Sequence, residues 1–253
     1  MDYMHKDLWK KLIAAVFALA VWQTASMLVG HEILLASPVS VLRTLFSIVS
    51  ESSFRAIVGT SSLRIITGFL AAYAAGLILG IVSARFEWIR TLLWPFMICI
   101  KTVPVASFIV LSLIWLSSGQ LTSFVSFLAC LPSVYNNVSE GISSVDRGQK
   151  EAAQMLGAGW LRTIRAVVIP NISTYLTAAA STACGTAFKA GAAAEVVAVV
   201  SGSIGEQIYM SKGYFETARL FAWTLVIVLL SFVFEKAFCL LLRKAIGLCS
   251  GRH

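Results

Sequence analysis

The sequence predicts an all-α membrane protein with about six transmembrane helices. Of its 253 residues, 58% are hydrophobic and only 13% are charged, and the mean hydropathy is +0.84. Soluble domains average about 45–50% apolar and about 25% charged residues, so lipid is the expected solvent. The apolar runs are long and unbroken, whereas a membrane β-barrel shows short segments of alternating hydrophobicity. Helices are favoured because each one satisfies its own backbone polar groups in hydrocarbon.

Six segments are expected as spans, because a spanning helix needs about 20 mostly apolar residues. They cover residues 12–28, 63–83, 92–116, 121–138, 169–200 and 217–242. The third is expected to be interrupted at Pro95 and Pro104, because proline lacks a backbone N–H donor. With no linker or repeat to divide it, the chain is expected to form a single domain over residues 1–253.

The segments between and within these spans have distinct patterns. Residues 34–50 predict a short interfacial helix that begins at Ser37-Pro38, a helix-start signal. The second span contains Gly68, Gly76 and Gly80, a spacing that lets helices approach closely. The fifth span is rich in Ala, Gly, Ser and Thr, which predicts a tightly packed interior helix. Residues 201–216 are expected to form a glycine-containing loop.

The net charge of +8 is unevenly distributed along the chain. Lys and Arg concentrate before the first span, after the last one and in alternate loops, so the positive-inside rule places both termini in the cytoplasm. No basic stripe interleaved with aromatic residues is present, so nucleic acid is not expected as a partner. The five cysteines have no CxxC spacing, which favours small buried side chains over disulfides or metal ligands.

The long cytoplasmic segment of residues 139–168 contains the main functional signal. Glu151, Ala152 and Ala153 are expected to start a short helix with small side chains on its surface, and Gly157 is expected to end or bend it. A second short amphipathic helix follows, and Pro170 opens the next span. The two helices are predicted to lie along the inner face of the membrane, where the small residues make a surface that another protein can approach.

This segment resembles the EAA motif of the permease subunits of binding-protein-dependent ABC importers. Glu-Ala-Ala, three further residues and glycine are followed by Ile169-Pro170, where the family usually has Leu-Pro. The resemblance extends to the proline-interrupted third span and to the sequence 203–208 after the fifth. Together these features are most similar to the nitrate, sulfonate and taurine branch of the family.

The resemblance implies the transmembrane domain of a type I ABC importer, assembled as a homodimer in the bacterial cytoplasmic membrane. It implies that Glu151, Ala152, Ala153 and Gly157 form a coupling helix that contacts two separate ATPase subunits. An extracytoplasmic solute-binding protein is implied as the donor of the solute. The chain has no GxxxxGK[ST] sequence for phosphate binding. ATP and Mg are therefore expected on the partner, and this chain is not expected to be an enzyme or to hold a cofactor or metal.

Three ionisable residues are expected inside the membrane. Burying a charge in lipid costs free energy, so such side chains usually face other protein or a water-filled cavity. Lys101 lies in the third span, and Lys189 and Glu195 lie in the fifth. One interpretation is that the lysines line the pathway and attract an anionic solute, such as a sulfonate, taurine or nitrate. A second is a structural ion pair between one lysine and Glu195 across helices, and a third is that the lysine side chains extend to the membrane interface. Lys189 and Glu195 are about 240° apart around an ideal helix and are not expected to pair with each other within it.

Two other function classes are weighed against the importer. A secondary transporter driven by an ion gradient would show an inverted repeat and helices broken at the midplane. No convincing repeat is present. An intramembrane enzyme would need a clustered nucleophile and base or a metal set such as HExxH. The histidines are His5, His31 and His253, all outside the expected spans.

Overall fold

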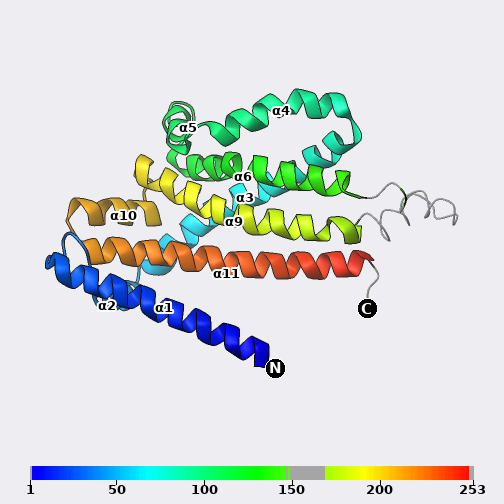
Figure 1. Cartoon of the computed structure of the whole chain (residues 1–253). Coiled ribbons are helices and arrows are strands. Elements are labelled where there is room, and N and C mark those ends of the chain that lie inside the picture. The colour runs from blue at the N-terminus through cyan, green and yellow to red at the C-terminus, as the bar shows by residue number, and fades with distance from the viewer. Residues whose placement is uncertain (1, 146–147, 149–168, 251–253) are drawn as a thin grey trace.

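The computed structural model describes residues 2–145, 148 and 169–250, and the helical fold predicted from the sequence is confirmed over this part of the chain. Most of the long helices run roughly parallel or antiparallel to one axis (Figure 1). Their bounds are α1 Asp2–Val29, α2 Pro38–Val49, α3 Phe54–Arg85, α4 Glu87–Thr102, α5 Val105–Ser112, α6 Ser118–Ser143, α9 Ile169–Ala198, α10 Ile204–Gly213 and α11 Thr217–Ser250.

Each expected span coincides with a helix or with a helix pair. Among the described helices, three are long and apolar enough to cross a membrane, over Leu12–Val29, Phe54–Arg85 and Thr217–Gly247. The pair α4 and α5 adds a fourth if it is counted as one broken span. Helices α6 and α9 are long enough, but they contain many small and polar residues. The count of six spans therefore stays a prediction.

The third expected span is broken once, at Pro104, and the expected interruption at Pro95 is wrong. Helix α4 continues through Pro95 and ends at Thr102. Val103 is extended, with φ −68° and ψ 131°, because the ring of the following proline disfavours helical backbone in the residue before it. Helix α5 begins after Pro104, at an angle of 97° to α4.

Helix α2 confirms the start signal that the sequence predicted. The Ser37 side chain accepts a hydrogen bond from the Ser40 backbone N–H at 3.1 Å, and Pro38 occupies the first turn. Helix α2 packs across α11 through Val41 and Ile48, which lie in one cluster with Trp223.

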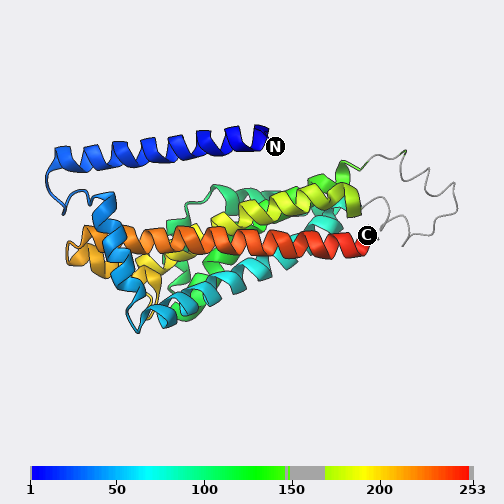
Figure 2. The same ribbon diagram turned by 90° about the horizontal axis from the view of Figure 1, so that it is seen from below.

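The first helix stands apart from the bundle formed by the others. Figure 2 shows α1 separated from the bundle along most of its length. Its polar links to the rest of the chain lie near its end, where Trp22 Nε1 donates to the Ala36 carbonyl at 3.1 Å and Ser26 Oγ donates to the Leu35 carbonyl at 2.9 Å. The apolar face of α1 is thus left for lipid or another protein chain.

The core of the fold is the packing of α3, α6, α9 and α11. Side chains of α6 bond directly to the backbone of α9: Ser126 Oγ donates to the Ala187 carbonyl at 3.2 Å, and Cys130 Sγ donates to the Ala183 carbonyl at 3.1 Å. Such short contacts require small residues on both helices. The prediction of a tightly packed fifth helix is confirmed.

The glycines of α3 make its close approach to α6 possible. A Cβ added at Gly76 would lie 2.8 Å from Val134, and one added at Gly80 would lie 2.8 Å from Val138. At Gly68 the added carbon would overlap the carbonyl oxygen of Ser123, which belongs to the α6 backbone and cannot rotate away.

We expect Gly68→Ala to destabilise the protein by about 1–3 kcal/mol, the usual cost of overpacking a core. Gly59→Ala is the matched control, because Gly59 lies on the same helix and an added Cβ there meets nothing within 4 Å. Thermal unfolding of the detergent-solubilised protein measures the difference. Equal unfolding midpoints for the two variants would contradict the close approach of α3 and α6.

The directions of the helices agree with a chain whose two ends lie on one side of the membrane. The end of α6, the start of α9 and the end of α11 lie at one end of the bundle, and α1 runs from that side towards the other (Figure 1). Helices α2 and α10, the end of α1 and the start of α11 lie at the opposite end, which we call the outer end.

The segment 201–216, expected as a loop, contains helix α10, so that expectation is wrong. The Ser203 side chain accepts from the Glu206 backbone N–H at 3.1 Å, and Glu206 Oε2 accepts from the Gly202 N–H at 2.7 Å. This is a variant of the capping box, in which Glu206 accepts from the residue before the cap instead of from Ser203 itself, and its Ser-x-x-Glu signature is present in the sequence.

Candidate functional site

The predicted coupling residues are mostly outside the part of the chain that the structure describes. Glu151, Ala152, Ala153 and Gly157 lie in the undescribed segment 149–168, so their roles stay predictions. The segment predicted to begin at residue 139 begins later, because α6 continues to Ser143. Pro170 lies at the start of the described part of α9, where its carbonyl accepts a hydrogen bond from Ser173 Oγ at 2.7 Å.

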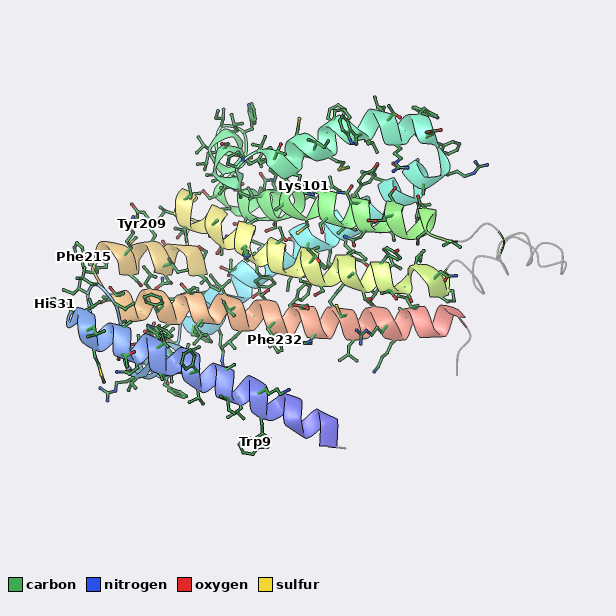
Figure 3. All side chains as sticks on the ribbon, in the orientation of Figure 1. Trp9, His31, Lys101, Tyr209, Phe215 and Phe232 are labelled. Atoms are coloured by element: carbon green, nitrogen blue, oxygen red, sulfur yellow. The ribbon has the colours of Figure 1, made fainter. Side chains whose placement is uncertain are left out.

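The structure does not bring the three intramembrane candidates together. Lys101 is exposed in the last turn of α4 (Figure 3), and Lys189 is exposed on α9. Glu195 is 0% exposed. The ion pairs within the described residues join Arg219 to Glu51 and Glu216, so neither lysine pairs with Glu195 in this chain.

Lys189 belongs to a polar stripe along the exposed face of α9. Four exposed polar residues and one exposed alanine recur at spacings of three, four, four and seven, which places them on one side of the helix. They are Asn171, Thr174, Ala178, Thr182 and Lys189, and we call them the α9 stripe. The opposite face is made of buried small residues, including Ala179, Ala183 and Ala187. The exposed face of this helix is therefore more polar than its buried face.

Helix α11 exposes mostly apolar side chains and serves as a comparison. Most of its exposed side chains between residues 228 and 241 are large and apolar, and the exceptions are Lys236 and Ala237. The large apolar ones are Val228, Leu229, Phe232, Val233, Leu240 and Leu241. That is the composition of a surface that faces lipid tails, whereas a polar stripe at the same depth faces water or protein.

A cavity of about 500 Å³ lies between the inner halves of α9 and α11. Its walls include Thr174 and Ala178 of the α9 stripe, with Glu235 and Arg243 of α11. Ser181 Oγ donates to Glu235 Oε1 at 2.6 Å across it. A second cavity of about 410 Å³ adjoins the first, since both are lined by Thr174, Thr177 and Arg243. The polar surface of α9 thus continues into a hollow that reaches the end of the bundle opposite the outer end.

Glu195 lies in a different setting, at the outer end of α9. Its Oε2 accepts from Ser61 Oγ at 2.8 Å and from the Gly205 N–H at 3.2 Å. The same Ser61 oxygen accepts from the Ile204 N–H at 2.8 Å. Sequence analysis singled out Glu195 but missed Ser61 and Gly205, because their partners become neighbours only when α3, α9 and α10 meet.

The chain is similar to several known proteins. The family model for the inner membrane component of binding-protein-dependent transport systems matches residues 76–245, which is more than half of the chain. A putative ABC transporter permease of Methanocaldococcus jannaschii is 24% identical over 241 residues, covering 91% of this chain and 88% of that protein.

Two relatives with named solutes also match. The taurine transport system permease protein of Escherichia coli is 24% identical over 227 residues, covering 87% of this chain and 82% of that protein. The nitrate import permease protein of Synechococcus elongatus is 25% identical over 202 residues, covering 76% of this chain and 72% of that protein. The chain therefore belongs to the family of inner membrane components of binding-protein-dependent transport systems.

Proposed function

We propose that two copies of this chain form the translocation pathway of an ATP-driven importer for a small anionic solute, such as a sulfonate, taurine or nitrate. The observation that carries the proposal is the α9 stripe, a polar surface left exposed on a helix packed into the core of the fold. In a two-fold assembly each copy presents the same surface to its partner. Two such stripes facing each other would line a path from about the depth of Lys189 to the cavity between α9 and α11.

The preference for an anion rests on Lys189. It precedes the end of α9 by nine residues, a rise of about 14 Å. In a hydrocarbon core about 30 Å thick, that depth is close to the midplane. A charge at this depth is costly unless it meets water, an opposite charge or a bound solute. The solutes named for two relatives, taurine and nitrate, both carry an anionic group.

The partners and the energy source follow from the same proposal. Two ATPase subunits, which bind ATP and Mg, dock on the segment that contains Glu151 to Gly157. An extracytoplasmic binding protein delivers the solute to the outer end of the bundle, in a bacterial cytoplasmic membrane. Closure of the ATPase pair moves the docked segments as rigid bodies, which opens the path outward, and hydrolysis resets it.

Cysteine accessibility tests whether the α9 stripe faces a water-filled path. In a variant without the five native cysteines, we expect Thr182→Cys to react with a membrane-impermeant, negatively charged thiol reagent in the assembled transporter. Val228→Cys on α11 is the matched control, because Val228 is exposed on the apolar side of a spanning helix. The reagent needs the thiolate, which does not form in lipid. Similar slow labelling at both positions would show that the stripe faces lipid and would refute the proposed path.

A further inference from the structure

The corner between α9 and α10 is held in a strained conformation. The Val200 N–H donates to the Glu195 carbonyl at 3.0 Å, which closes the end of α9. The residue between α9 and Val200 is Val199, whose φ of 47° lies in the left-handed region. Helices usually place glycine at this position, and a β-branched residue is an outlier there. The surrounding contacts therefore fix this corner against the preference of its own backbone.

Those contacts are made by the first backbone amides of α10. The N–H groups of Ile204, Gly205 and Glu206 donate to Ser61 Oγ, Glu195 Oε2 and Ser203 Oγ, respectively. A helix start leaves such donors without partners inside the helix, and a carboxylate placed there is also favoured by the helix dipole. Two of the three acceptors come from α3 and α9, so the start of α10 is tied to both core helices.

The packing at the corner leaves no space for a looser arrangement. A Cβ added at Gly205 would overlap Glu195, so the first turn of α10 lies directly on the last turn of α9. Ser61, Glu195, Ser203 and Ile204 are all buried. Solute in the proposed path does not reach this corner, because Glu195 is about 120° from the centre of the α9 stripe around an ideal helix.

The other end of α10 is turned outward. Tyr209 is 45% exposed and Phe215 is 71% exposed, and Figure 3 shows both side chains at the outer end of the bundle. Phe215 has φ 59°, a second bulky residue held in the left-handed region. The first turn of α10 is thus bonded to α3 and α9, whereas the side chains of Tyr209 and of Phe215, just beyond the helix, are exposed at the outer end of the bundle.

We infer that Glu195 and Ser61 form a latch that makes α10 move as one body with α3 and α9. Glu195 is a positioning residue: it contacts no solute, and it acts by fixing the start of α10. Contact of the external binding protein with the exposed end of α10 is then transmitted to the two core helices, α3 and α9. This last step rests on the proposed function, because it needs the binding protein as the partner.

Hydrogen exchange at the amides of residues 204 and 205 measures the latch without any partner protein. In the purified chain in lipid nanodiscs, we expect Ser61→Ala and Glu195→Gln to speed exchange there by about tenfold or more, because each removes or weakens hydrogen bonds that these buried amides make. Thr60→Ala is the matched control, since the Thr60 hydroxyl donates only to the Ala56 carbonyl of its own helix. Exchange in α6 should stay unchanged in all three variants. Unchanged exchange at 204 and 205, or an equal rise in α6, would overturn the latch.

The coupling is tested in the assembled transporter with its ATPase and binding protein. We expect Ser61→Ala and Glu195→Gln to reduce the stimulation of ATP hydrolysis by the loaded binding protein about threefold or more, with the unstimulated rate unchanged. Thr60→Ala should keep full stimulation. Faster exchange with full stimulation would overturn the transmission through α10. If the wild-type assembly shows no stimulation at all, the proposed function fails, while the exchange result still decides whether the latch exists.

Discussion

Glu151→Lys should reduce ATP-driven solute uptake to background and should release the ATPase subunits from the solubilised complex. The resemblance to the EAA motif implies that Glu151 and the small residues after it lie against the ATPase. Reversing the charge at such a contact leaves a repulsion and a long side chain where a close approach is needed. The measurement is uptake into proteoliposomes, with co-purification of the ATPase from the same membranes.

Gln154→Lys is the control for that experiment. It adds the same side chain three residues further along the same segment, at one of the three positions where the motif specifies no residue type. We expect it to keep most of the uptake and the bound ATPase. If Glu151→Lys and deletion of the segment both leave ATPase binding intact, this segment does not couple the two subunits.

Lys189→Gln should lower the uptake of an anionic solute by about tenfold or more, and Lys189→Glu should lower it further. Removing the charge takes away an attraction for the anion close to the midplane, and a bond to a charged group is worth about 1.5–3 kcal/mol. Each 1.4 kcal/mol corresponds to a factor of ten. The dependence of the uptake rate on the concentration of loaded binding protein separates a loss of solute passage from a loss of docking.

Lys212→Gln is the matched change for Lys189→Gln, because Lys212 is an exposed lysine on α10, at the outer end and away from the α9 stripe. We expect nearly full uptake from it. If Lys189→Gln keeps full uptake but lowers the unfolding temperature of the assembled complex, Lys189 makes a structural ion pair with another chain.

Local signals in the sequence predicted much of the fold because neighbouring residues determine them. Ser37-Pro38 is such a signal, and the structure confirms the helix start there. Gly68, Gly76 and Gly80 predicted a close helix contact because their spacing alone places them on one face, although the partner helix, α6, could not be known from it.

The failures come from two sources. Helix α10 differs from the expected loop because the Ser203–Glu206 cap starts a helix in spite of the glycines of this segment. The break at Pro104 and the continuity through Pro95 differ because a helix tolerates a proline when its surroundings compensate for the lost bond, which a single sequence does not reveal.

The candidate site shows the same division. The sequence located Lys189 and Glu195 in one helix and predicted that they would not pair there. Lys189 is exposed and Glu195 is buried because one face of α9 packs against the other core helices and the opposite face does not. Ser61 is an ordinary serine in the sequence, and its role depends on contacts with residues 134 and 143 positions away.

The central claim is that this chain carries solute by using ATP hydrolysed on a partner. Reconstitution into proteoliposomes, with the ATPase inside and the loaded binding protein outside, tests it most directly. We expect uptake that needs both ATP inside and the binding protein outside, and that is unaffected when ionophores collapse the ion gradients. Uptake that proceeds without ATP and stops when the gradients are collapsed would show a secondary transporter and contradict the account.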